Sequence, residues 1–241
     1  MKAEVMFASI NGIQIYYQKS GEGYPLILLH GNSQDHTFFD DLINQLANQY
    51  TVYALDSRGH GKSSITPKLK HSDMVEDIAY FIQELGLEKP ILCGSSDGGV
   101  IGLMLAARYP GILSKLVVCG ANSKVEGLKA WFVNTMRFCY SLSIKSKNPK
   151  NIVMTQKLGL ILDQPEITKA DLQQITVPTL VLAGSRDLVK DGHTREMAAC
   201  ITDHSLFVLK GETHTSYIKN SSKLCTVMLP FLEYKPDSIS E

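Results

Sequence analysis

The amino-acid sequence predicts an α/β fold with one doubly wound, mostly parallel sheet, and three observations lead to this prediction. Short apolar segments alternate with segments of helical periodicity along most of the chain. The apolar segments lack polar alternation, as expected for strands that helices cover on both faces. The chain has 241 residues, enough for one domain with a complete core, and we assign residues 1–241 to a single domain.

The strands are predicted from turn signals and apolar segments. Val5–Ile10 and Ile13–Gln18 form a hairpin, because Asn11-Gly12 between them is a strong two-residue turn signal. Six later apolar segments are predicted to be buried strands: Pro25–Leu29, Tyr50–Leu55, Pro90–Cys93, Leu116–Cys119, Thr179–Ala183 and Leu206–Leu209. Strands separated by helices join into parallel sheets.

Helices are predicted between these strands. The clearest covers Asp73–Leu85, where the apolar residues share one face, with Asp73 as the N-cap and Gly86 after the last turn. A second helical pattern covers Val100–Tyr109. A third apolar stripe lies near the C-terminus, between Ile218 and Phe231.

A long segment, about residues 123–168, lacks any strand signal. It contains two helix-compatible stretches, Gly127–Leu142 and Ile152–Leu162, separated by Lys, Asn and Pro residues. Insertions of this length inside a compact domain are commonly functional, so we expect a helical cap or lid. A pair of ordinary crossover helices is the alternative.

Composition excludes several classes of function. The formal net charge is zero, so a nucleic-acid partner is not expected. The apolar segments are too short to span a bilayer, the first residues show no secretory signal, and we expect no membrane partner. The five cysteines are odd in number and form no C-x-x-C pair, which favours a reducing compartment, the cytoplasm. The sequence does not predict the oligomeric state.

The strongest chemical signal is a G-x-S-x-G pattern, Gly94-Ser95-Ser96-Asp97-Gly98. It lies between a predicted strand and a predicted helix. In this position glycines allow a tight turn that presents a serine hydroxyl beside the positive end of a helix. The alternative is a Gly- and Ser-rich helix start without catalysis.

Four motifs occur at the ends of predicted strands: Leu29-His30-Gly31-Asn32, Asp56-Ser57-Arg58-Gly59-His60-Gly61-Lys62-Ser63, the turn at Ser96, and Leu182-Ala183-Gly184-Ser185-Arg186-Asp187. With these motifs the chain resembles α/β-hydrolase fold enzymes of the compact serine esterase and peroxidase-like group. The resemblance implies an eight-stranded sheet with a cap inserted after the sixth strand. It also implies that His30, His60, Asp56 and Arg58 are structural.

A serine nucleophile needs a base, and His214 is the best candidate among seven histidines. It follows the last predicted strand, at the carboxyl edge of the sheet, where the resembled family has its catalytic histidine. Asp187 follows a neighbouring strand and is predicted to orient the imidazole, which gives the order Ser96, Asp187, His214. Asp191 is the nearest competing acid, and Gly120-Ala121-Asn122 offers no carboxylate.

Residues for substrate binding are predicted around this triad. The resemblance implies an oxyanion hole formed by the backbone N–H groups of Asn32 and Asp97. The Asp97 carboxylate would favour substrates with a cation if it faced the pocket, whereas otherwise it would cap the helix that it begins. In the predicted lid, Trp131 and Phe132 are candidates for an apolar acyl site.

The predicted activity is hydrolysis of small-molecule carboxylic esters through an acyl-enzyme on Ser96, with no cofactor and no metal. No metal-ligand spacing occurs in the sequence. A C–C bond hydrolase, a thioesterase or a perhydrolase would use the same triad. A non-catalytic ligand receptor on this fold is a further alternative.

Overall fold

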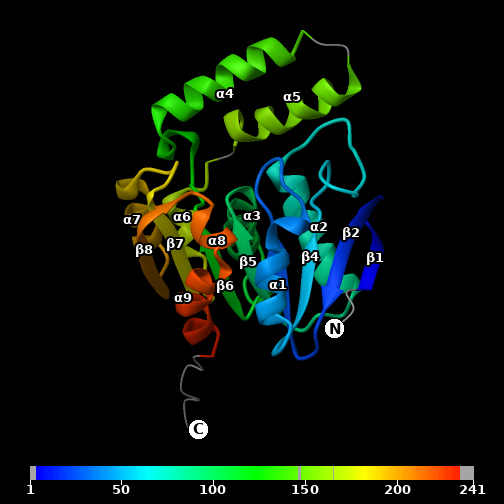
Figure 1. The fold of residues 1–241 in the computed structure, drawn as a ribbon, viewed down its shortest axis with the longest axis vertical. Helices are drawn as coiled ribbons and strands as arrows, with labels where there is room; N and C mark the ends of the chain where they lie inside the picture. Colours follow the sequence, from blue (N-terminus) through cyan, green and yellow to red (C-terminus); the bar gives the residue numbers. More distant parts are fainter. Residues whose placement is uncertain (1–3, 146–147, 165, 234–241) are drawn as a thin grey trace.

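The computed structural model describes residues 4–145, 148–164 and 166–233, and its centre is a sheet of eight strands (Figure 1). The strands are β1 (Glu4–Ile10), β2 (Ile13–Ser20), β3 (Tyr24–Leu29), β4 (Tyr50–Leu55), β5 (Ile91–Ser95), β6 (Lys115–Cys119), β7 (Thr179–Arg186) and β8 (His204–Thr213). The helices are α1 (Asp40–Leu46), α2 (His71–Glu84), α3 (Asp97–Arg108), α4 (Ala130–Ser143), α5 (Pro149–Leu162), α6 (Lys169–Gln173), α7 (Asp191–Ala199), α8 (Ser216–Lys219) and α9 (Ser221–Glu233), with the 3-10 turns η1 (His36–Phe39) and η2 (Val125–Gly127).

The sheet is mostly parallel, as the sequence predicts. Its order is β1-β2-β4-β3-β5-β6-β7-β8; β1 and β2 pair antiparallel, β2 joins β4 antiparallel, and the remaining pairs are parallel. The hairpin turn between β1 and β2 has positive φ at both Asn11 and Gly12, 47° and 74°, the backbone that this two-residue turn requires. The predicted α/β class is therefore confirmed.

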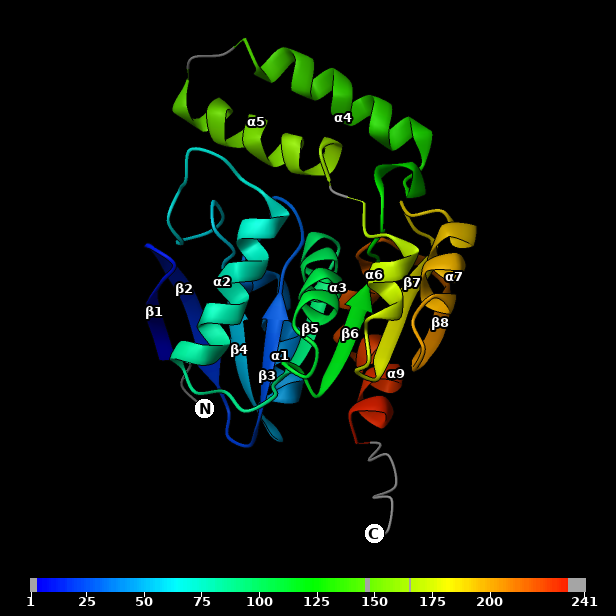
Figure 2. The ribbon, with the colours of Figure 1, turned by 180° about the vertical axis from the view of Figure 1, so that it is seen from behind.

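Helices cover both faces of the central strands, which explains why β3 to β6 and most of β7 carry no polar alternation. The side chains of α2, α3, α6 and α7 pack on one face in a single apolar cluster (Figure 2). The opposite face carries a second cluster, to which α1, α8 and α9 contribute. Sheets buried on both sides in this way are built from continuously apolar strands.

Two predictions about helices are wrong in detail. Helix α2 begins at His71, so Asp73 is its third residue rather than its cap, and the capping position, Lys70, makes no side-chain cap bond. His71 is buried, and burying this side chain draws the start of the helix back by two residues. The apolar stripe between Ile218 and Phe231 is divided between two helices, α8 and α9. The short helices α1 and α6 were not predicted, because one or two turns give too little periodicity to recognise.

Between β6 and β7 the chain leaves the sheet and forms a helical hairpin, α4 and α5, within the segment of about 123–168. Residues 146–147 and 165 of that segment lie outside the described residues. The hairpin stands above the carboxyl ends of the parallel strands, and α4 is the outer helix over most of its length (Figures 1 and 2). Among the described helices, none combines the length and the hydropathy that crossing a bilayer requires.

A buried ion pair joins the loop after β4 to α2, and the turn of the β1–β2 hairpin bonds to the same carboxylate. Arg58, which follows β4, donates to both carboxylate oxygens of Asp77 on α2 at 2.5 Å. The Asn11 side-chain amide donates to the same carboxylate at 3.0 Å. Both Arg58 and Asp77 are buried, so each depends on the other to compensate its lost hydration.

We expect Asp77→Asn to destabilise the fold by about 3 kcal/mol, because it leaves the buried Arg58 guanidinium without its full countercharge. For a chain of this length the melting temperature should fall by roughly 6 to 12 °C. Calorimetry or thermal circular dichroism measures this shift. Asp203→Asn, at an exposed position, is the matched control. Equal melting temperatures for the two variants would contradict a stabilising role of the pair.

Candidate active site

Ser96 occupies the turn that joins the end of β5 to the start of α3. Its backbone has φ 52° and ψ −116°, a conformation that residues with a side chain rarely adopt. Two hydrogen bonds hold it there, from Ser96 N–H to the Cys119 carbonyl at 2.8 Å and from Val100 N–H to the Ser96 carbonyl at 3.0 Å. The strained turn raises the hydroxyl above the carboxyl edge of the sheet.

The flanking glycines are required by close backbone contacts. A Cβ atom on Gly98 would lie 2.2 Å from the carbonyl oxygen of Leu29, at the end of β3. A Cβ atom on Gly94 would lie 2.2 Å from the carbonyl oxygen of Gly98 itself. Atoms do not approach so closely, so the turn forms only with glycine at both positions. The G-x-S-x-G spacing thus follows from packing at this edge.

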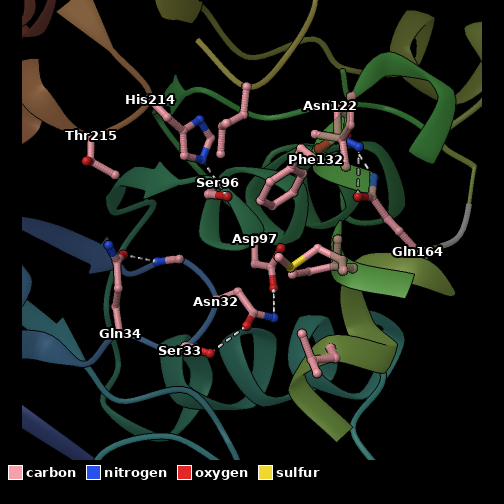
Figure 3. Close-up of a pocket in the computed structure, with 16 residues that line it drawn as sticks. Asn32, Ser33, Gln34, Ser96, Asp97, Asn122, Phe132, Gln164, His214 and Thr215 are labelled. Atoms are coloured by element: carbon pink, nitrogen blue, oxygen red, sulfur yellow. Dashed lines mark hydrogen bonds between the residues drawn. The ribbon is translucent and has the colours of Figure 1, made fainter. Parts of the chain in front are cut away.

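The three predicted residues of the triad lie within hydrogen-bonding distance of one another, and Figure 3 shows the contact between Ser96 and His214. The hydroxyl of Ser96 lies 3.0 Å from Nε2 of His214, and Nδ1 of the same ring lies 2.6 Å from Oδ1 of Asp187. A carboxylate accepts hydrogen bonds, so Nδ1 carries the proton in the neutral ring. The lone pair of Nε2 therefore faces the serine hydroxyl, which is the arrangement that a general base needs.

Asp187 is buried and fully engaged by donors. Its carboxylate accepts from the N–H groups of Val189 and Gly184, at 3.0 and 3.3 Å, besides the His214 imidazole. Burial raises the pKa of this carboxyl, but the imidazole and the two N–H groups outweigh that effect and hold the pKa below its ordinary value. Asp187 therefore remains a charged acceptor at neutral pH.

Gly120 provides the space for the imidazole, and the sequence analysis did not assign it a role. A Cβ atom there would lie 3.0 Å from the His214 ring and 3.4 Å from Asp187. Its φ of +63° also favours glycine. The available signal was its position directly after the sixth strand, at the same sheet edge as Ser96.

The competing acid and the histidines of the two turns lie outside the triad. Asp191 begins α7, is exposed and pairs with Arg195 at 2.9 Å. His30 is buried; its Nδ1 lies 2.8 Å from the Gly31 carbonyl, and its Nε2 accepts from the N–H of Ser57 at 3.0 Å, so it joins two turns. Burial lowers the pKa of His60 to about 4.

The predicted oxyanion donors lie beside the serine. Asp97 N–H is the first of α3, and Asn32 N–H follows Gly31, whose Cβ position would be 3.0 Å from Cβ of Ser96. Within the described part of the chain, neither N–H donates a hydrogen bond. Two N–H groups without an acceptor next to a nucleophile can stabilise a developing oxyanion.

A cavity of about 310 Å³ opens above Ser96. Its lining combines polar groups of the strand ends with apolar side chains of α4 and α5: Gly31, Asn32, Ser33, Gln34, Ser96, Asp97, Asn122, Leu128, Phe132, Met136, Leu158, Ile161, Gln164, Leu188, His214 and Thr215. Phe132 lines the cavity as expected, whereas Trp131 does not and is 60% exposed. Trp131 was expected to share this site, but it occupies the outer face of α4.

Asp97 is one of the residues that line this cavity. It accepts from the side-chain amide of Asn32 at 3.0 Å and lies 3.9 Å from Nε2 of the buried His71. Burial raises the pKa of the Asp97 carboxyl, but His71 and Asn32 outweigh burial and lower it. His71 is the first residue of α2 and is buried beside Asp97.

Two amide side chains join the ends of the helical insertion. Asn122 donates to Oε1 of Gln164 at 2.9 Å, and Gln164 donates to the backbone carbonyl of Asn122 at 2.8 Å. Both residues are buried and both line the cavity. Gln164 is not predictable from the sequence, because nothing in the chain marks it as a partner for a residue 42 positions away.

One cluster of potential metal ligands occurs among the described residues, namely Asp35, His36 and Asp56. Asp56 accepts from the backbone N–H groups of His36 and Lys62, at 2.7 and 2.8 Å, and from the His36 ring. Asp35 caps η1 through Thr37. These contacts hold the turns after β3 and β4, and none of the three residues lines the cavity.

Comparisons with known proteins identify relatives of the chain and of its fold. The family model of the alpha/beta hydrolase fold matches residues 24–142. The chain is similar to the serine hydrolase BPHL of Homo sapiens, with 32% identity over 148 residues, or 58% of this chain and 51% of that protein. It therefore spans about half the length of that relative; the Mus musculus protein of the same name is 25% identical over 93% of this chain and 85% of its own.

The 3-oxoadipate enol-lactonase 1 of Acinetobacter baylyi is 25% identical over 95% of this chain and 97% of that protein. The crystal structure of a hydrolase from Pseudomonas aeruginosa superposes with a TM-score of 0.83 at 20% identity, covering 96% of this chain and 99% of that one. The matching family model, the full-length relatives and the superposition lead to one conclusion. The chain belongs to the α/β-hydrolase fold superfamily.

Proposed function

We propose that the protein is a serine hydrolase of small carboxylic esters, with Ser96 as nucleophile, His214 as general base and Asp187 as the orienting acid. The observation that carries the proposal is the unbroken line of hydrogen bonds from Ser96 through His214 to Asp187, at 3.0 and 2.6 Å. The Ser96 end of this line opens into a cavity whose volume, about 310 Å³, suits a small substrate.

The reaction proceeds in two steps. Oγ of Ser96 attacks the ester carbonyl carbon while its proton passes to Nε2 of His214. The carbonyl oxygen becomes an oxyanion, which accepts from the N–H groups of Asn32 and Asp97. The tetrahedral intermediate then collapses; the C–O bond to the alcohol breaks, and the alcohol leaves with the proton from His214. Water, deprotonated by His214, attacks the acyl-enzyme by the same route and releases the carboxylic acid.

The surroundings of the serine favour an ester hydrolase over a ligand receptor. A receptor needs neither a strained serine turn nor two N–H groups left without acceptors, and each costs stability. The similar enol-lactonase acts, by its name, on a lactone, which is a cyclic ester. C–C bond hydrolases, thioesterases and perhydrolases would share the triad, so a substrate panel decides between them.

The cavity walls indicate the substrate's shape. Phe132, Met136, Leu158 and Ile161 provide an apolar surface for the acyl or alcohol group. Because these residues belong to α4 and α5, we propose that the helical hairpin acts as the lid of the site. Asp97 adds a negative charge to the cavity wall, so among esters those with a cationic group should be preferred.

We expect Ser96→Ala to lower kcat for a p-nitrophenyl ester by at least roughly a thousandfold, because the nucleophile is removed. The wild type should also show a burst of p-nitrophenol and be labelled by a fluorophosphonate, whereas Ser96→Ala should show neither. Ser222→Ala, at an exposed serine, is the control and should label normally. Labelling of Ser96→Ala at the wild-type level would refute the assignment.

We expect Asp187→Asn to lower kcat on the order of ten thousandfold while the protein remains folded. An amide nitrogen placed toward Nδ1 favours the wrong imidazole tautomer, so Nε2 loses its lone pair toward the serine. Steady-state kinetics with the same ester measures this effect. Asp191→Asn, the competing acid of the sequence analysis, should retain the wild-type rate; the reverse outcome would exchange their roles.

We expect Asp97→Asn to lower kcat/KM for a cationic amino-acid ester by roughly tenfold or more, relative to a neutral ester of equal size. The pKa of the Asp97 carboxyl is lowered, so the carboxylate stays charged at neutral pH. The preference is therefore present above that lowered pKa and lost only as the pH falls through it. Asp163→Asn, outside the cavity lining, should leave the ratio unchanged. An unchanged ratio in Asp97→Asn removes this part of the proposal.

A further inference from the structure

The outer face of α4 carries three large apolar side chains in a row. Trp131, Phe138 and Leu142 are spaced by seven and four residues, which places them in one narrow line along the helix. They are 60%, 64% and 60% exposed. We call these three residues the outer stripe.

The outer stripe is separate from the apolar face that α4 uses for packing. Phe132 and Met136 line the cavity, and Val133 is buried against the body of the protein. In the outer stripe, the only ring contact among the described residues is between Trp131 and Phe132, with centroids 5.9 Å apart. The helix is thus apolar on two sides, one of them unused within the chain.

The segment around the outer stripe is strongly basic. Residues 127–162 contain no Asp or Glu, although the whole chain has 24 acidic residues and 24 Lys and Arg residues. The same segment contains Lys129, Arg137, Lys145, Lys147, Lys150 and Lys157. Arg137 and Lys145 are exposed, and neither forms an ion pair within the described part of the chain.

The shape and charge of this face select one kind of partner. The outer stripe lines neither the cavity above Ser96 nor the neighbouring cavity along α5, and α4 is the outermost helix of the fold (Figures 1 and 2). Neither of these two cavities therefore offers a peptide a groove along the stripe. A second copy of the chain would bring two basic surfaces together, which like charges oppose. An exposed aromatic and aliphatic row flanked by cations fits the boundary between lipid headgroups and acyl chains.

We propose that the outer stripe, with Arg137 and Lys145, docks the protein on an anionic lipid surface, with α4 lying in the plane of the headgroups. Apolar side chains enter the interface while the cations pair with lipid phosphates. Docking brings the cavity lined by Phe132 and Met136 within about one helix diameter, ~10 Å, of the lipid. The expectation of no membrane partner rested on the lack of a spanning segment and of a secretory signal, and neither observation bears on docking at a lipid surface.

The chain contains its own reporter for this contact, because Trp131 is its only tryptophan. We expect vesicles of equal parts phosphatidylglycerol and phosphatidylcholine to shift the Trp131 emission to shorter wavelength. Vesicles of phosphatidylcholine alone should give a much weaker response, and added salt should reverse part of the binding. Co-sedimentation with the same vesicles provides an independent measure of affinity.

Two double variants that keep Trp131 separate the apolar and the ionic contributions. Phe138→Ser with Leu142→Ser should weaken binding by roughly a hundredfold. Arg137→Gln with Lys145→Gln should weaken it by roughly twentyfold on anionic vesicles. The matched controls are Phe207→Ser, an exposed apolar residue on β8, and Lys210→Gln with Lys219→Gln; both should bind as the wild type does. Circular dichroism and the melting temperature establish that each variant is folded.

Each other result overturns the proposal. An emission spectrum that neither vesicle changes excludes lipid docking. Equal binding of the wild type and both test variants excludes this face. Emission that responds to polyglutamate but not to vesicles identifies an acidic protein as the partner, and a concentration-dependent dimer that Phe138→Ser with Leu142→Ser abolishes identifies a second copy. These measurements do not involve ester hydrolysis, so they stand or fall independently of the proposed catalytic activity.

Discussion

The tight turn at Ser96 is the constraint on which the site depends. Its backbone is strained, and it persists because the surrounding strands leave no alternative path. Gly98 packs against the end of β3 and Gly94 against Gly98, both at distances that exclude a side chain. The same contacts set the position of α3 and hence of the Asp97 N–H. Strain stored here is offset by the two buried apolar layers on either side of the sheet.

The fold was largely predictable because its signals are local. All eight strands correspond to apolar segments or to the Asn11-Gly12 hairpin, and their ends differ from the prediction by only a few residues at most positions. The start of α2 was wrong because burial of His71, a tertiary effect, outweighed the capping preference of Asp73. The order of the strands was not deduced, because pairing between distant segments leaves no trace in the periodicity of either one.

The site was predictable to the extent that strand ends determine it. Ser96, Asp187 and His214 each follow a strand of the parallel part of the sheet, so topology alone brings them to one edge. The requirement for glycine at position 120 could not be deduced from the sequence. It arises because the imidazole of His214, far away in the chain, occupies the space that a Cβ atom would fill. Trp131 and Phe132 are neighbours in sequence, but Trp131 is exposed and Phe132 lines the cavity. The orientation of α4 about its own axis decides which side chain faces the cavity, and the composition of the segment does not reveal that orientation.

The paired amides of Asn122 and Gln164 fasten both ends of the helical insertion to each other at the rim of the cavity. The chain leaves the sheet at Asn122 and returns toward it at Gln164, so the helices α4 and α5 lie between these two residues. Ser96, Asp187, His214 and the N–H groups of Asn32 and Asp97 all belong to other segments of the chain. The helices between these residues supply apolar walls of the cavity, whereas the strand ends beneath supply Ser96, Asp187 and His214. What the cavity admits and what the serine can do are therefore written in separate stretches of the chain.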